Sequence, residues 1–372
     1  MLSFHELKVR SVDRVAEDAA CVTVEIPAAL REAFEFHAGQ YVTVRRMIGG
    51  REERRTYSIV TAPGNRTLKL GIRLQSGGRM SAELGTQLRP GDTLEVGTPM
   101  GRFRTAISAA REHSYVAFAA GSGITPILSL ATDILAREPR SRFTLIYGNR
   151  SISRTMFLEE TLALKNLYVD RFSVHFVLSR EPQQTEWLNG RIDAAKVAEL
   201  ARHMVEISTA DEYLICGPGD MVDAVRTAIK ALNDKAPIRF ERFAGATPGP
   251  RDASTPESAA ASASTAAPAR VPAPASAAPL ATISVVMDGR RRSFSMLPGD
   301  GSVLEAAERA GLNLPFSCRS GICATCRARI TEGAAVMAHN IALEPWETAA
   351  GFVLCCQARP TTPTLELSYD HK

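Results

Sequence analysis

The sequence predicts three folded domains: an antiparallel β-barrel, an α/β domain with a parallel sheet, and a small α+β domain. Short β-like runs separated by turns fill residues 1–107, and apolar strands alternate with helical stretches over residues 108–243. A segment of different composition, residues 244–280, precedes a mixed α and β pattern over residues 281–372. A chain of 372 residues is long enough for two or three such domains.

The composition is that of a globular protein, with 45% hydrophobic and 23% charged residues. The formal net charge of +4, from 44 basic and 40 acidic residues, gives no reason to expect a nucleic-acid or anionic-membrane partner. No apolar run reaches 18 residues, and charged side chains occupy residues 5–10, where a signal peptide needs an apolar core. We therefore expect a cytoplasmic protein that binds neither nucleic acid nor membrane.

The first domain has short runs with alternating or β-branched residues, bounded by turn dipeptides that contain glycine. The runs are Cys21–Ile26, Tyr41–Val44 and Leu68–Ile72, and the turns lie at Pro63-Gly64, Gly77-Gly78 and Pro90-Gly91-Asp92. This pattern predicts an antiparallel barrel.

The second domain has four apolar strands separated by helical stretches. They are Tyr115–Ala119, Phe143–Tyr147, Phe172–Leu178 and Tyr213–Cys216. Such alternation predicts a parallel sheet, whose ligands bind beyond the carboxyl ends of its strands.

Residues 244–280 are predicted to be a disordered linker. Alanine, serine, threonine, proline and glycine make up 31 of these 37 residues, which leaves almost nothing to bury. A passive spacer and an arm that lets the C-terminal domain move are both compatible with this composition.

The third domain begins with a predicted hairpin, Thr282–Met287 and Arg292–Met296, that turns at Asp288-Gly289. A helix over Ser302–Ala310 follows and ends at Gly311. Strands at Arg327–Ile330 and Thr364–Ser368 complete the α+β unit.

Cysteines are concentrated in the third domain, with the spacing Cys318-x4-Cys323-x2-Cys326 and then Cys356. This spacing is typical of a plant-type ferredoxin [2Fe–2S] cluster. Structural zinc is the alternative, but zinc sites usually contain two Cys-x-x-Cys pairs and this region has one. The spacing alone does not decide between Cys355 and Cys356 as the fourth ligand.

Small residues in the cysteine loop, namely Gly321, Ala324 and Thr325, are expected to let backbone N–H groups approach the sulfur atoms. Such hydrogen bonds would stabilise the negative charge of a reduced cluster.

Two segments of the barrel domain could bind a flavin. Arg55-Thr56-Tyr57-Ser58 offers a phosphate ligand, a ring contact and a hydrogen bond to a heterocycle, although the tetrapeptide alone also suits a surface strand. Gly77-Gly78-Arg79-Met80-Ser81 offers backbone N–H groups to an anion at the start of a helix, which Ser81 could cap.

Two loops of the α/β domain could bind a dinucleotide. Gly121-Ser-Gly123-Ile-Thr125-Pro126 is a glycine-rich turn that opens a helix, although it lacks the third glycine of the usual fingerprint. Cys216-Gly217-Pro218 repeats the arrangement after a later strand. Arg150 with Ser151 follows a third strand, and an arginine there suits a 2′-phosphate, which favours NADPH over NADH.

Taken together, these segments resemble the ferredoxin–NADP reductase superfamily over residues 5–243. The resemblance implies FAD rather than FMN as the flavin and places Ser58, Thr125 and Cys216 at the reaction centre. It implies that Thr125 lies near the flavin, that Cys216 lies near the nicotinamide C4 and that Phe243 covers the flavin ring. In the third domain, Gly351–Cys356 is similar to the closing strand of plant-type ferredoxins, which implies that Cys356 is the fourth cluster ligand.

The order of flavin barrel, nucleotide domain and C-terminal ferredoxin resembles the reductase components of multicomponent oxygenases, and in particular the phenylacetyl-CoA epoxidase reductase family. The resemblance implies an NADPH-dependent enzyme that uses FAD and a [2Fe–2S] cluster to pass electrons to an oxygenase with a diiron centre. A flavin is needed between the two others because NADPH delivers two electrons together and the cluster accepts one at a time.

Three alternatives remain open at this level. The chain could use NADH to serve a Rieske or ketosteroid oxygenase, hold its cofactors as a redox sensor without turnover, or be a zinc-stabilised scaffold. A basic surface of Arg319, Arg327 and Arg329 is a further hypothesis, since it could dock an acidic patch on an oxygenase.

Overall fold

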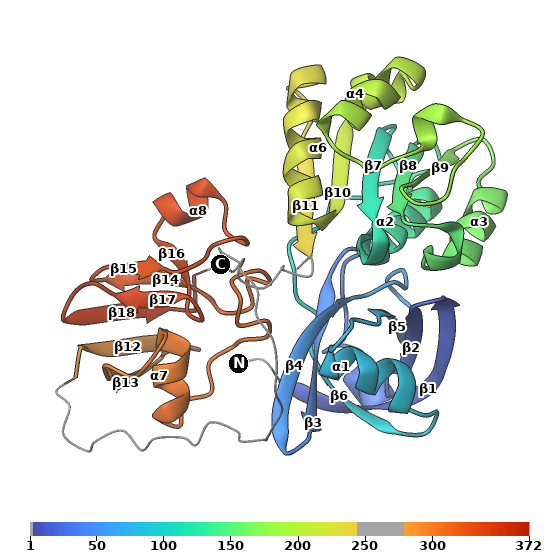
Figure 1. Cartoon of the computed structure of the whole chain (residues 1–372). Coiled ribbons are helices and arrows are strands. Elements are labelled where there is room, and N and C mark those ends of the chain that lie inside the picture. Colours follow the sequence, from blue (N-terminus) through green and yellow to red (C-terminus); the bar gives the residue numbers. More distant parts are fainter. Residues whose placement is uncertain (1–2, 244–278, 372) are drawn as a thin grey trace, which may run out of the picture. The chain divides into compact units, whose positions relative to one another are not determined.

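The computed structural model describes residues 3–243 and 279–371. Two compact units make up the structure, and the colours of Figure 1 follow the sequence through them. Of the described residues, the first unit comprises 3–243 with Pro315–Thr325, and the second comprises 279–314 with 326–371. The predicted linker falls outside the described residues except at its last two positions.

The first unit begins with a six-stranded antiparallel sheet in the order β4-β3-β6-β1-β2-β5. Its strands are β1 Phe4–Ala16, β2 Ala19–Glu25, β3 Tyr41–Ile48, β4 Arg51–Ser58, β5 Thr67–Arg73 and β6 Thr93–Gly97. Ile59 forms an antiparallel bridge with Leu70 of β5, so the sheet closes on itself as a barrel. Short helices lie beside it: η1 Ala28–Leu30, α1 Arg79–Ala82 and the π-helical η2 Glu83–Gln87. The predicted antiparallel barrel is confirmed.

A five-stranded parallel sheet follows in the same unit, in the order β11-β10-β7-β8-β9. Its strands are β7 Ser114–Ala120, β8 Arg142–Asn149, β9 Phe172–Leu178, β10 Glu212–Pro218 and β11 Ile238–Phe243. Its helices are η3 Gly121–Gly123, α2 Ile124–Arg137, η4 Ile152–Arg154, α3 Leu158–Leu167, η5 Glu186–Leu188, α4 Ala194–His203, α5 Glu206–Thr209 and α6 Gly219–Leu232.

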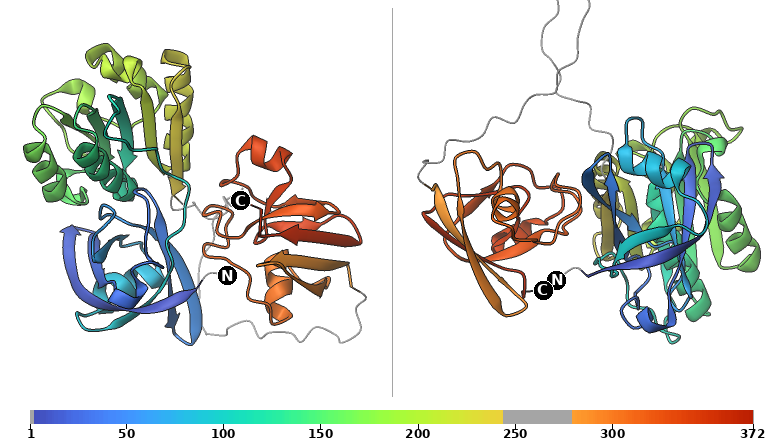
Figure 2. Two further views of the ribbon diagram at one scale, coloured as in Figure 1. Left: turned by 180° about the vertical axis from the view of Figure 1, so that it is seen from behind. Right: turned by 90° about the horizontal axis from the view of Figure 1, so that it is seen from below.

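Helices cover both faces of this sheet (Figures 1 and 2). On β7, Tyr115 and Ala117 pack in one apolar cluster with α2 and α3, whereas Val116 and Phe118 pack in another with α4, α5 and α6. The chain order reverses between the adjacent strands β7 and β10, and ligands of such sheets bind at this point. The predicted parallel α/β domain is confirmed.

The C-terminal part has a five-stranded sheet in the order β13-β12-β18-β14-β16 and the two-stranded sheet β15-β17. Its elements are β12 Ala281–Met287, β13 Arg290–Met296, α7 Val303–Arg309, β14 Arg327–Glu332, β15 Ala335–Met337, α8 Pro345–Ala349, β16 Phe352–Leu354, β17 Ala358–Pro360 and β18 Thr364–Ser368. Asp288 and Gly289 both have positive φ, +52° and +69°, as a tight hairpin turn requires. The side chain of Ser302 caps α7 by accepting the backbone N–H of Glu305 at 3.3 Å.

Among the helices of the described residues, none has both the length and the apolar character needed to cross a bilayer.

Candidate redox site

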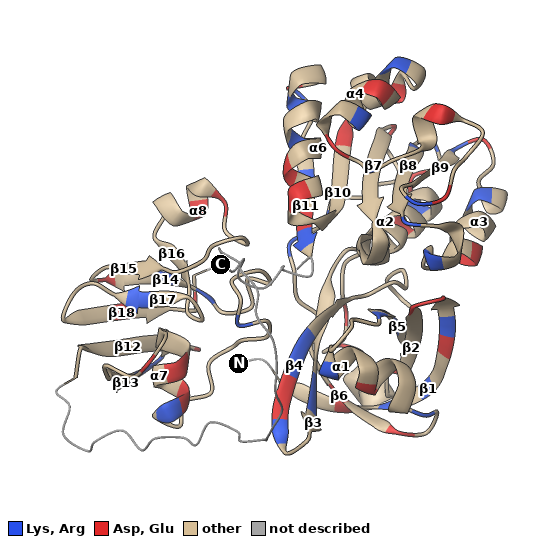
Figure 3. Ribbon diagram, in the orientation of Figure 1, with Lys and Arg blue, Asp and Glu red and all other residues tan. Residues whose placement is uncertain are grey.

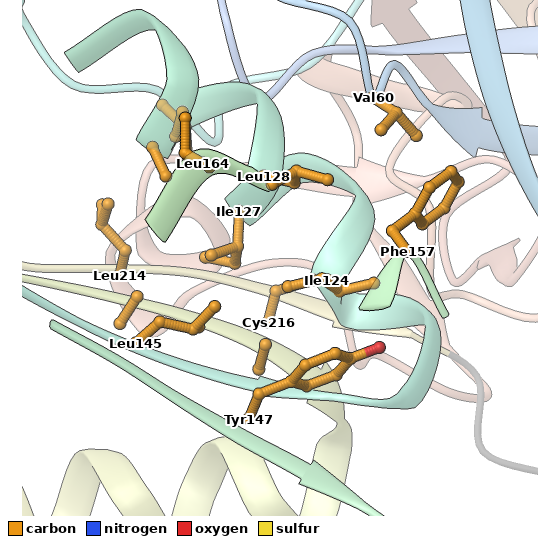
Figure 4. Packing of buried hydrophobic residues seen from close by; sticks show 14 of the residues in the cluster. Val60, Ile124, Ile127, Leu128, Leu145, Tyr147, Phe157, Leu164, Leu214 and Cys216 are labelled. Carbon is orange, nitrogen blue, oxygen red and sulfur yellow. The ribbon is translucent and has the colours of Figure 1, made fainter. Parts of the chain in front are cut away.

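The two predicted nucleotide loops lie against each other at the carboxyl ends of β7 and β10. A Cβ atom on Gly123 would stand 2.6 Å from the carbonyl carbon of Cys216, so only glycine allows this approach. Gly121 has φ +54°, and its carbonyl accepts a hydrogen bond from the buried Tyr147 hydroxyl at 2.9 Å. Figure 4 shows Cys216 and Tyr147 among the buried side chains beside Ile124. The loop geometry matches a glycine-rich turn at the start of α2.

Thr125 lies in the first turn of α2 and faces the barrel. It is 2% exposed, and its hydroxyl donates to the carbonyl of Ser122 at 2.9 Å. Its methyl carbon is 2.6 Å from the position of a Cβ atom on Gly71 of β5, so this strand needs glycine there. Thr125 therefore lies where the nucleotide loop contacts a barrel strand.

Ser58, Cys216 and Glu241 come together from three strands, β4, β10 and β11. Glu241 is paired in register with Cys216, and the Ser58 hydroxyl donates to its Oε2 atom at 3.4 Å. Loss of water contact raises the pKa of Glu241 to about 7, an effect that the Ser58 hydrogen bond partly offsets. Burial and the nearby Glu241 charge raise the pKa of the Cys216 thiol well above its ordinary value. This group combines a neutral thiol with a carboxyl that can exchange a proton near neutral pH.

Sequence reasoning did not single out Glu241, although a signal was present. The stretch Arg239-Phe-Glu-Arg-Phe243 places an acidic residue close to the carboxyl end of a strand of the parallel sheet, where ligands of such sheets bind. Phe243, which ends the same strand, pairs with Pro218 and packs against the apolar cluster beneath the two loops.

The side chains of β4 alternate between its two faces, so Arg55 and Tyr57 lie on one side and Thr56 and Ser58 on the other. Arg55 is ion-paired with Glu53, with 3.1 Å between its Nη2 and a carboxylate oxygen. Burial raises the pKa of Tyr57 above its ordinary value, so the hydroxyl stays neutral. The predicted flavin residues are therefore divided between two faces of one strand.

The second predicted flavin segment forms α1 and the turn before it. Gly77 has φ +71°, and Gly78 is the N-cap of the four-residue helix. The prediction that Ser81 caps the helix is wrong, because Ser81 lies inside it and its hydroxyl donates back to the Gly78 carbonyl at 3.0 Å. The Met80 side chain packs in the barrel core, so only its backbone could contact a cofactor. Arg79 is ion-paired with Glu53 at 3.4 Å.

Arg150 is exposed at the end of β8, and its carbonyl accepts the backbone N–H of Arg180 at 2.9 Å. Sequence reasoning did not assign Arg180, which follows the neighbouring strand β9. The Ser151 hydroxyl is 3.1 Å from that of Ser153. Arg154 is ion-paired with Asp18. This backbone hydrogen bond brings Arg180 beside Arg150, the residue that the sequence assigned to a 2′-phosphate.

In the cysteine loop of the first unit, backbone N–H groups surround the sulfur of Cys318. Those of Ser320, Ile322 and Cys323 lie 3.4, 3.5 and 3.4 Å from it. Interaction with Cys323, followed by these N–H groups, lowers the pKa of Cys318 to about 4. Ala324 adopts φ +54°. The expected approach of N–H groups to a sulfur of this loop is confirmed for Cys318, and a sulfur so surrounded suits an anionic cluster.

In the second unit, Cys326 and Cys356 are adjacent, and the Cys356 thiol raises the pKa of Cys326 well above its ordinary value. Cys355 is fully buried, and its backbone N–H donates to the Cys326 carbonyl at 3.0 Å. Across the described residues no three potential metal ligands form one group. The structure thus places the predicted ligands as two pairs, Cys318 with Cys323 and Cys326 with Cys356.

The hypothesis of a basic docking surface is wrong for Arg327. Its guanidinium is ion-paired with the buried Glu347 at 2.9 Å and lies 3.5 Å from the ring centre of Phe352. Only 14% of its side chain is exposed, so it braces α8 against β16 and is not available to a partner.

Comparisons with known proteins assign a family description to each part. Residues 6–105 match the oxidoreductase FAD-binding domain, residues 118–227 the oxidoreductase NAD-binding domain and residues 285–361 the 2Fe-2S iron-sulfur cluster binding domain.

Two curated relatives match almost the whole chain. One of the subunits of 1,2-phenylacetyl-CoA epoxidase from Escherichia coli is 38% identical over 100% of this chain and 99% of its own length. The ferredoxin reductase component of 3-ketosteroid-9-alpha-monooxygenase from Rhodococcus rhodochrous is 28% identical over 98% and 96%. Among solved structures, phthalate dioxygenase reductase has the same fold, with a TM-score of 0.56 at 22% identity over 98% of each chain.

Proposed function

The chain belongs to the family of oxygenase reductase components that join FAD-binding, NAD-binding and 2Fe-2S domains, and we propose that its electron acceptor is a phenylacetyl-CoA epoxidase with a diiron centre. The observation that carries this proposal is identity along the whole chain, 38% with the epoxidase component against 28% with the ketosteroid component. Redox proteins of this kind whose cysteines are not joined in disulfides suit the cytoplasm, where thiols stay reduced.

When bound, the flavin converts the two-electron chemistry of the nicotinamide nucleotide into the one-electron chemistry of the cluster. Ser58, Cys216 and Glu241 would supply hydrogen-bonding groups to it, and Glu241 holds or releases a proton near neutral pH. Thr125 and Phe243 border the same region from α2 and β11. No residue of the group needs to act as a nucleophile, since the buried Cys216 thiol stays neutral.

We assign the flavin phosphates to Arg55, Arg79 and the backbone of residues 77–81, and we assign the nicotinamide nucleotide to Gly121, Gly123, Gly217 and Pro218. NADPH is proposed as the donor because Arg150 and Arg180 lie on adjoining strand ends, where two cations would favour a 2′-phosphate. Ser151 could add a hydroxyl to the same group.

We assign the [2Fe–2S] cluster to Cys318, Cys323, Cys326 and Cys356. Two observations support these four: their sequence spacing, and the N–H groups directed at the sulfur of Cys318. Cys355 is left out because Cys356 is the cysteine whose thiol interacts most strongly with that of Cys326.

The acceptor is tested by reconstitution. Purified full-length protein, NADPH and the oxygenase component of phenylacetyl-CoA epoxidase are expected to consume phenylacetyl-CoA, with NADPH oxidised in proportion. The oxygenase component of a 3-ketosteroid monooxygenase serves as the control and should receive few electrons. Equal or faster transfer to the ketosteroid component, or a preference for NADH, would contradict the proposal.

A further inference from the structure

One carboxylate lies between the two arginines that we assign to the flavin phosphates. The oxygens of Glu53 are 3.1 Å from Nη2 of Arg55 and 3.4 Å from Nη1 of Arg79. The Glu53 side chain is 12% exposed, whereas those of Arg55 and Arg79 are 48% and 45% exposed. The carboxylate is therefore the enclosed member of the group, and the cations face solvent.

Local structure explains how these three charges meet. Glu53 and Arg55 are two residues apart on β4 and so lie on the same face, and the strand carries both acidic and basic residues (Figure 3). Arg79 comes from the start of α1 and also donates to the carbonyl of Ile48, near the turn that joins β3 to β4. Glu53 therefore connects two elements, because it pairs with Arg55 of its own strand β4 and with Arg79 of α1.

Two arginines could bind a phosphate here, but the carboxylate of Glu53 already accepts from both guanidinium groups. A guanidinium binds carboxylate and phosphate through the same pairs of N–H donors, so the two anions are alternatives for one arginine. With Glu53 ionised, the three side chains carry one net positive charge in place of two. A flavin phosphate at these arginines must therefore share their donors with the carboxylate or displace it.

We propose that Glu53 limits the affinity of the site for the flavin phosphate groups by competing with them for Arg55 and Arg79. The inference rests on the flavin-phosphate assignment made above and adds a residue that sets how tightly the cofactor is held. Ion pairs with such exposed arginines are individually weak, so the competition lowers the affinity without preventing binding.

The test is to measure flavin affinity in the Glu53→Gln variant of the full-length protein. Flavin is removed from wild type and variant, and FAD, FMN and riboflavin are titrated back by calorimetry. The variant is expected to bind FAD and FMN about three- to tenfold more tightly. Riboflavin, which has no phosphate, should bind to both proteins equally.

Glu52→Gln is the matched control, because Glu52 lies on the opposite face of β4 and pairs with Arg54 at 2.7 Å. It should leave FAD affinity unchanged. Glu53→Ala provides a second variant without the carboxylate and should also tighten binding, with circular dichroism confirming that both variants fold.

Unchanged or weaker FAD binding by folded Glu53→Gln and Glu53→Ala overturns the proposal, as does an equal gain for riboflavin. Arg55→Ala distinguishes a failure of the flavin-phosphate assignment from a failure of the competition by Glu53. If it weakens FAD binding while the Glu53 variants do nothing, the phosphate assignment stands and the competition fails. If it has no effect, both fail.

Discussion

Replacing Gly123 by alanine should force the nucleotide loop away from the end of β10. The new Cβ atom would stand 2.6 Å from the carbonyl carbon of Cys216 and 3.0 Å from the nitrogen of Gly217, whereas ordinary contacts begin at 3.4 Å. The carbonyl oxygen of Cys216 would be closer still, so the loop and strand must separate by more than about 0.8 Å, and since the opposing atoms are backbone, no side chain can rotate away. Overpacking typically costs about 1–3 kcal/mol, and a backbone clash belongs at the upper end.

The assay is thermal unfolding of the full-length protein, followed by NADPH binding to the variant. A loss of about 3 kcal/mol corresponds to a melting temperature about 6–12 °C lower for a domain of this size. NADPH affinity should fall with it, because the displaced loop is the proposed pyrophosphate site. Gly217→Ala is the control: its Cβ atom would meet the flexible end of Met221 at 2.8 Å, so the variant should melt within a few degrees of wild type. If Gly123→Ala melted and bound NADPH like wild type, the close packing of the two loops would be refuted.

Three other predictions concern charge and ligands. Because the pKa of Glu241 is raised from 4.5 to about 7, the protonated group contributes stability at pH 4.5 and below, and this stability is lost as the pH rises to about 7. Glu241→Gln should therefore have a higher melting temperature than wild type at pH 8 and lose that advantage at pH 5. Equal differences in melting temperature at both pH values would contradict the raised pKa. Cys356→Ala should abolish the iron–sulfur absorption and keep the flavin, whereas Cys355→Ala should keep both, as measured by visible spectra and iron content; the reverse result would exchange the two cysteines. Arg150→Ala should raise the KM for NADPH about tenfold through loss of a charged hydrogen bond and leave that for NADH unchanged, and equal effects on both nucleotides would remove the 2′-phosphate role.

Periodicity in the sequence was sufficient to predict the core of each domain. The apolar runs of the second domain became β7, β8, β9 and β10, because strands buried on both faces leave long apolar segments. The hairpin at Asp288-Gly289 and the helix that ends before Gly311 were predictable because their turn and stop residues are specific.

Other elements left weak signals. β1 is 13 residues long, but its charged and polar residues at exposed positions hide the alternation. β4 is rich in charged residues, and two of its ion pairs form only when β3 and α1 lie beside it. β15 and β17 have three residues each, too few for a periodic pattern.

The candidate site was partly predictable for the same reason. Glycine turns and cysteine spacing are local in sequence, so Gly123 and the cysteine loop could be recognised. Glu241 is 183 residues from Ser58, and Glu53 meets Arg79 from another element, so their roles depend on tertiary contacts. Arg327 was misassigned because the sequence does not show that Glu347 and Phe352 enclose it.

The most direct test of the proposed electron path is an anaerobic titration of the purified full-length protein with NADPH, followed by visible absorption. We expect flavin bands and a broad iron–sulfur absorption that both bleach as NADPH is added, with iron bound and no zinc. Flavin bands that bleach beside a four-cysteine zinc site, or an iron–sulfur absorption that stays oxidised after the flavin is reduced, would contradict it.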